Sequence, residues 1–191
     1  MRLLPFCLVL SGILATPAFA HTGPASTGSF AAGVAHPFSG ADHLVAMTCA
    51  GLWSGLVGRT AIIAWPVTFV TAMLGGFAAA NAGLQPGLVE VSTSLSVMLL
   101  GAFVAFDLTM PAVLGAAVLG LFAFFHGYAH GTEASPALLP YVTGFTMATV
   151  ALLAAGIAVA AWTKSVVQRV AIRVAGGCAA VAGLFLLGGL A

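Results

Sequence analysis

Six apolar runs constrain the fold of this chain more than any other feature. They cover residues 40–57, 61–80, 88–106, 112–129, 138–162 and 174–190. Each run is close to the roughly 20 residues that an α-helix needs to cross the hydrocarbon core of a bilayer. Charged residues make up 5% of the chain, whereas a soluble domain carries about 25%. The sequence therefore predicts an all-α integral membrane protein with six transmembrane helices.

The first residues have the three parts of a secretory signal peptide. Arg2 gives a positively charged start, residues 3–14 are apolar, and residues 18–20 read Ala-Phe-Ala, a small-x-small cleavage site. The apolar part is short for a membrane span, which favours cleavage over an uncleaved anchor. Removal of residues 1–20 would leave residues 21–191 as a single six-helix transmembrane domain that begins at His21 on the exported side.

The basic residues give an independent indication of orientation. An exported amino terminus makes the connections after the first, third and fifth runs cytoplasmic. These connections, up to the edge of the sixth run, hold every basic residue of the predicted mature chain: Arg59, Lys164, Arg169 and Arg173. Cytoplasmic loops are enriched in Lys and Arg. We therefore expect a multi-pass protein of the bacterial inner membrane with both mature ends in the periplasm.

Two groups of ionisable residues flank the apolar runs, and such residues in a membrane protein indicate function because burying them is expensive. They are His36, Asp42 and His43 at the start of the first run, and His126, His130 and Glu133 at the end of the fourth. Because the two runs cross in opposite directions, both groups are expected at the exported side. His126 and His130, four apart, can share a helix face, and so can His36 and His43, seven apart.

These groups predict one shared metal site. Imidazole combined with carboxylate suits Ni, Zn, Cu or Co, whereas all-oxygen sites suit Mg or Ca. Met47, one turn past His43, is an additional candidate ligand, although packing is its simpler role. His21 is another, since its α-amine and imidazole would chelate a metal together after cleavage; otherwise it is merely the first mature residue.

Other polar residues are candidates for a path across the membrane. Glu90 begins the third run on the exported side, where it could join the mouth of a path. Asp107 ends this run on the cytoplasmic side, where it could pair with Arg59 or receive a departing cation. Solvation at the membrane interface is by itself a sufficient reason for both acids to lie at these positions. Hydroxyl groups inside the runs could line a route, although bonding to their own helix is their commoner use: Ser92, Ser94, Ser96, Thr143, Thr146 and Thr149.

The two groups lie in motifs that resemble those of the HupE/UreJ nickel permeases, a family associated with hydrogenase and urease operons. The family carries His-x5-Asp-His in its first mature span, matched by residues 36–43, and Phe-His-Gly-x-Ala-His-Gly-x-Glu in its fourth, matched by residues 125–133. The signal peptide, length and six spans also agree. The resemblance implies uptake of Ni²⁺ for a metalloenzyme such as hydrogenase or urease, through His36, Asp42, His43, His126, His130 and Glu133.

The resemblance implies a transported ion and no permanently bound cofactor, and Co²⁺ or Cu²⁺ fits the same ligand types. A net charge of +1 excludes an electrostatic nucleic-acid binder. Without a Walker A motif, a facilitator driven by the membrane potential is favoured. The alternatives are an intramembrane zinc hydrolase, which lacks its His-Glu-x-x-His signature, and a bis-histidine haem carrier. We thus expect a non-enzyme whose partners are the metal ion and the lipid bilayer, and a homo-oligomer is one arrangement that the sequence allows.

Overall fold

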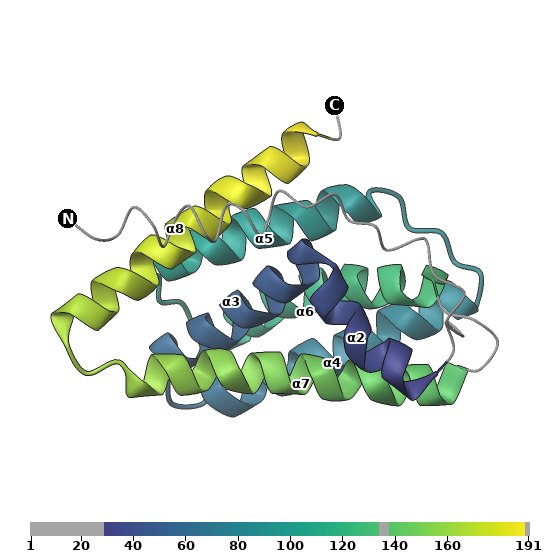
Figure 1. Ribbon diagram of the computed structural model, residues 1–191, viewed down its shortest axis with the longest axis horizontal. Helices are drawn as coiled ribbons and strands as arrows, with labels where there is room; N and C mark the ends of the chain where they lie inside the picture. The colour runs from purple at the N-terminus through teal and green to yellow at the C-terminus, as the bar shows by residue number, and fades with distance from the viewer. Residues whose placement is uncertain (1–28, 134–137, 190–191) are drawn as a thin grey trace.

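The computed structural model describes residues 29–133 and 138–189, and every regular element within them is an α-helix (Figure 1). The helices are α2 (Phe30–Ser39), α3 (Ala41–Val57), α4 (Ala61–Asn81), α5 (Val89–Ala105), α6 (Ala112–Glu133), α7 (Leu138–Trp162) and α8 (Val166–Gly188). The described residues therefore confirm the all-α class. The predicted signal peptide and His21 lie outside them.

Within the described residues, four helices are long and apolar enough to cross a membrane: α4, α6, α7 and α8. Helix α5 is a shorter apolar helix of 17 residues, and α3 has the same length. The chain is accordingly a multi-pass membrane protein. A six-span topology, in which α3 and α5 also cross, stays a prediction.

The helix that follows the basic segment begins earlier than expected. A capping box starts α8 at Val166 instead of residue 174. The Ser165 hydroxyl accepts from the backbone N–H of Gln168 at 3.2 Å, and the Gln168 side chain accepts from the backbone N–H of Ser165 at 3.0 Å. Arg169 and Arg173 consequently lie on a helix and not in a connection.

The start of the first run also differs from expectation, because α2 and α3 are separate helices. Gly40 stands between them in an extended conformation, with φ −100° and ψ 116°. Helix α2 runs obliquely over one half of the bundle and packs on the start of α7 (Figure 1). A Cβ at Gly33 would collide with the Tyr141 carbonyl oxygen, and one at Gly144 with that of Phe30. His36 and His43 thus approach from two helices and do not share one helix face.

Three closely packed helix pairs build the bundle: α3 with α7, α4 with α6, and α5 with α8. Glycines bring the backbones together, as small residues do where lipid provides no hydrophobic force between helices. A Cβ at Gly76 on α4 would meet the Phe124 carbonyl oxygen, and one at Gly127 on α6 would meet that of Met73. Since Gly127 follows His126 directly, this contact sets the position of the second histidine motif.

Helices α3 to α8 run alternately along the bundle, so their connections gather at two ends (Figure 1). We call them the α2 end and the basic end. The basic end holds every Lys and Arg of the described residues: Arg59, Lys164, Arg169 and Arg173. There the Arg169 Nη1 lies 3.2 Å from the Asp107 Oδ2. Asp107 therefore pairs with Arg169, and the pairing with Arg59 that we considered is wrong.

Two tryptophans fill the bundle toward the basic end. The rings of Trp53 and Trp65 lie 4.4 Å apart between centroids, and both side chains are fully buried. Their indole N–H groups donate to carbonyl oxygens beside the connection from α5 to α6, Trp53 to Leu108 at 2.7 Å and Trp65 to Ala112 at 2.8 Å. The pair thus fills the interior toward this end.

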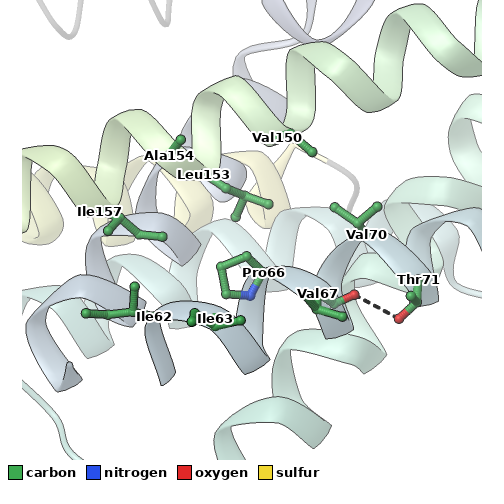
Figure 2. A pocket seen from close by; sticks show the side chains of 10 residues that line it. All are labelled: Ile62, Ile63, Pro66, Val67, Val70, Thr71, Val150, Leu153, Ala154 and Ile157. Atoms are coloured by element: carbon green, nitrogen blue, oxygen red, sulfur yellow. Dashed lines mark hydrogen bonds between the residues drawn. The ribbon is translucent and has the colours of Figure 1, made fainter. Parts of the chain in front are cut away.

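An apolar pocket of about 410 Å³ opens on the surface between α4 and α7 (Figure 2). Apolar side chains from both helices line it, among them Pro66 and Leu153. Its one hydroxyl, that of Thr71, donates to the Val67 carbonyl oxygen at 2.9 Å. The pocket therefore offers no ligands for an ion, and a candidate site has to lie elsewhere.

The glycine contacts predict that Gly76→Ala destabilises the protein by about 1–3 kcal/mol, the usual cost of overpacking. The reason is that the new methyl group would press on α6 backbone atoms, which cannot move without separating the helices. Gly75→Ala is the matched control, because a Cβ there meets nothing within 4 Å. Thermal unfolding in detergent should give a lower midpoint for Gly76→Ala than for Gly75→Ala. Equal midpoints would contradict the close contact.

Candidate metal site

Three histidines from three helices meet at the α2 end. One ring nitrogen each of His36 on α2, His43 on α3 and His130 on α6 lies within 4.8 Å of the others. Their ring centroids are 5.7 Å (His36 to His43), 4.6 Å (His36 to His130) and 4.7 Å (His43 to His130) apart. Metal–nitrogen bonds of about 2.0–2.1 Å place two ligands of one ion at most about 4 Å apart. Small ring rotations would therefore let all three bind one cation. We call these three residues the histidine cluster.

His130 is held so that its nitrogens stay available. Its ring is fully buried, and neither ring nitrogen has a hydrogen-bond partner among the described residues. The Phe145 ring stacks on it at 4.6 Å with an interplanar angle of 11°. A buried nitrogen without a partner costs about 1–3 kcal/mol. A bound cation would supply the missing partner.

His126 lies one turn further into the bundle on α6, with its ring 4.8 Å from that of His43. Its Nε2 is 2.8 Å from the Ser96 hydroxyl, which donates its single hydrogen to the Thr93 carbonyl oxygen at 2.6 Å. The Ser96 oxygen must therefore accept from an Nε2–H of His126. The neutral ring then carries its lone pair on Nδ1, which has no hydrogen-bond partner among the described residues. Ser96 thus presets His126 as an Nδ1 ligand.

Asp42 lies beside the histidine cluster and contacts one of its members. Its Oδ1 is 2.9 Å from the Nδ1 of His43. A carboxylate next to a histidine is the arrangement that orients imidazole ligands and raises their basicity in metal sites. The geometry therefore suits Asp42 to position His43 and to add negative charge beside the cluster.

The remaining candidates lie in other places. Met47 is one turn deeper than His43 and receives the Thr149 hydroxyl at 3.4 Å. Glu90 is exposed in the first turn of α5 at the α2 end, and Asp107 is at the basic end. Glu133 is the last residue of α6, which places the helix past Gly131, and nothing is described of its side chain. His21 falls outside the described residues.

The sequence did not predict that α7 would contribute aromatic side chains, those of Tyr141 and Phe145, beside the histidines. Phe145 stacks on His130, and the Tyr141 ring lies 5.8 Å from that of His36. Aromatic residues on an apolar helix are expected in the core, so no signal in the sequence marked them. Ser96 was considered as part of a path, but its contact with His126 was not anticipated.

The cluster predicts that His43→Ala or His130→Ala weakens Ni²⁺ binding at least about 100-fold, because even an outer-shell partner of a metal ligand is typically worth 10–100-fold in affinity. Thr132→Ala is the matched control. Thr132 is exposed, half a turn from His130, and its hydroxyl donates to the Ala129 carbonyl oxygen at 2.7 Å. Titration calorimetry of the detergent-purified full chain measures the affinity. Equal Ni²⁺ affinity in the wild type and in all three variants would show that these rings hold no metal.

Comparison with known proteins identifies the family of this chain. The family model described as HupE / UreJ protein matches residues 8–186. The curated relative Protein HupE from Rhizobium leguminosarum bv. viciae is 41% identical over 179 residues, which cover 90% of this chain and 91% of the relative. No solved structure matches. Proteins of this family are accessory membrane proteins and not enzymes. The resemblance carried by the two motifs is thus confirmed, and the chain belongs to the HupE/UreJ family.

Proposed function

We propose that the protein is a permease that carries a transition-metal cation, in the first place Ni²⁺, across the inner membrane for a metalloenzyme such as hydrogenase or urease. The observation that supports the proposal is the histidine cluster, together with the buried His126 Nδ1 and both ring nitrogens of His130, which have no hydrogen-bond partner among the described residues. Imidazole ligands suit Ni²⁺, Co²⁺ and Cu²⁺. Family membership favours Ni²⁺ among them, because the family is associated with hydrogenase and urease operons.

The proposed topology has six spans and an exported amino terminus after cleavage of residues 1–20. The basic end then faces the cytoplasm, in line with the positive-inside rule, and the histidine cluster faces the periplasm. A helix of 17 residues, such as α3 or α5, is about 25 Å long. That length is close to the hydrocarbon thickness of about 27–30 Å, which supports counting both as spans.

Selection at the cluster follows from ligand type. A cation that enters from the periplasm exchanges water for imidazole nitrogen at His36, His43 and His130. Mg²⁺ and Ca²⁺ prefer oxygen ligands, from water or from the protein. Exchange of their water for imidazole nitrogen would therefore give them little binding free energy at this cluster. His126 is the next ligand inward, since its ring lies 4.8 Å from that of His43 and its Nδ1 carries the lone pair.

The driving force is the membrane potential. A divalent cation that moves inward gains about 4.6 kcal/mol per 100 mV, twice the 2.3 kcal/mol of a single charge. This gain makes nucleotide hydrolysis unnecessary. Passage also requires Trp53 and Trp65 to separate, because both are fully buried across the basic end.

The transport proposal predicts that purified protein in vesicles with an inside-negative potential takes up radiolabelled Ni²⁺. His36→Ala and His43→Ala should each lower the initial rate at least about tenfold, which corresponds to 1.4 kcal/mol. Thr132→Ala should leave the rate at the wild-type value. Parallel assays with Co²⁺, Cu²⁺ and Zn²⁺ rank the metals. Unchanged Ni²⁺ uptake in both histidine variants would contradict transport through the histidine cluster.

A second prediction concerns pH. Imidazole binds metal only when neutral, and its ordinary pKa is about 6.5. Protons therefore compete with the metal increasingly as the external pH falls. Initial uptake rates, measured at a clamped potential between about pH 7.5 and pH 5.5, should fall with pH. A rate that rises toward pH 5.5 would show that proton competition at the histidines does not limit uptake.

A further inference from the structure

Two thioethers and a hydroxyl meet in the interior, one helical turn below the histidine cluster. Met47 on α3, Met73 on α4 and Thr149 on α7 are all fully buried. The Thr149 Oγ1 lies 3.4 Å from the Sδ of Met47 and 3.6 Å from the Sδ of Met73. Three helices thus direct one sulfur–oxygen–sulfur group to a single point. We call these three residues the thioether layer.

The hydroxyl of Thr149 is used differently from others in the bundle. Thr48 and Thr68 donate to carbonyl oxygens of their own helices, at 2.7 Å and 2.8 Å, which is the common use of Thr in a helix. Thr149 instead faces two sulfur atoms, which are weak acceptors. Its single hydrogen can satisfy one sulfur at a time. Lone pairs of the other sulfur therefore remain available at the point where the three side chains meet.

The layer lies on the inward course from the histidine cluster. Met47 follows His43 by four residues, a rise of about 6 Å along the helix. Thr149 follows Phe145 by the same spacing, and Phe145 stacks on His130. The backbone of Met73 touches Gly127, the neighbour of His126. The thioether layer therefore lies at the depth of His126, between the histidine cluster and the tryptophans.

We propose that Met47, Met73 and Thr149 form a second cation station, which receives the ion from His126 and rejects hard divalent cations. The proposal rests on the transport function proposed above. Thioethers bind soft and borderline transition metals, whereas Mg²⁺ dehydrates reluctantly and demands oxygen ligands. The three side chains are also uncharged, so they hold a divalent ion weakly. Weak binding at successive sites is what conduction requires.

The sharpest test replaces both sulfurs while preserving the packing. Exchange of Met for Leu nearly conserves volume and costs less than about 1.5 kcal/mol, so the double variant Met47→Leu/Met73→Leu should fold. Met147→Leu is the matched control, because Met147 lies on α7 with 60% of its surface exposed. Thermal unfolding of each protein in detergent checks the fold.

The expected results separate transport from binding at the histidines. In vesicles, the double variant should lose about tenfold or more of the initial rate of Ni²⁺ uptake, equivalent to at least 1.4 kcal/mol. Its calorimetric Ni²⁺ affinity, set by the histidine cluster, should stay at the wild-type value, and Met147→Leu should match the wild type in both assays. Thr149→Ser retains the oxygen and should keep uptake, whereas the isosteric Thr149→Val should lose it.

A spectroscopic readout shows whether the sulfur atoms touch the ion. Protein produced with selenomethionine and saturated with Ni²⁺ should show selenium neighbours in nickel K-edge absorption, and the double variant should not. Unchanged uptake in the folded double variant, or no selenium neighbour in protein that transports, overturns the thioether layer and leaves the permease intact. Absence of Ni²⁺ uptake by the wild type instead overturns the proposed function, and the second station with it.

Discussion

Contact between helix backbones at glycine is the interaction on which the candidate site depends. Lipid gives no hydrophobic force that would press apolar helices together, so the helices approach where side chains are absent. Gly76 and Gly127 join α4 to α6, and this contact sets the position of His126. Gly33 joins α2 to α7, about one turn before His36 on the same helix. These contacts lie next to the histidines that meet from three helices.

The interior resulting from this packing changes in chemistry with depth. Imidazoles and the carboxylate of Asp42 lie at the α2 end, and uncharged sulfur and hydroxyl groups lie one turn deeper. Trp53 and Trp65 are packed together toward the basic end. Ligand strength therefore decreases along the proposed course of the ion. Such an order lets a site select a cation at its mouth without trapping it inside.

Hydropathy and motif spacing predicted the helices and the histidine-bearing motifs, but not how the helices are rotated and broken. The break at Gly40 follows from the packing of α2 on α7, a tertiary contact that hydropathy does not encode. The early start of α8 could have been predicted from the sequence, since Ser165 and Gln168 have the spacing of a capping box. The contacts of Ser96 with His126 and of Phe145 with His130 could not be predicted from the sequence. They depend on which faces of α5 and α7 turn toward α6.

We propose that histidines of α2, α3 and α6 hold one transition-metal ion. A crystal of the full chain soaked in Ni²⁺ and measured at the nickel absorption edge tests it most directly, since anomalous scattering locates the metal itself. An anomalous peak is expected at about 2.0–2.1 Å from ring nitrogens of His36, His43 and His130. A fully occupied nickel peak elsewhere in the protein, with these three rings still apart, would contradict it.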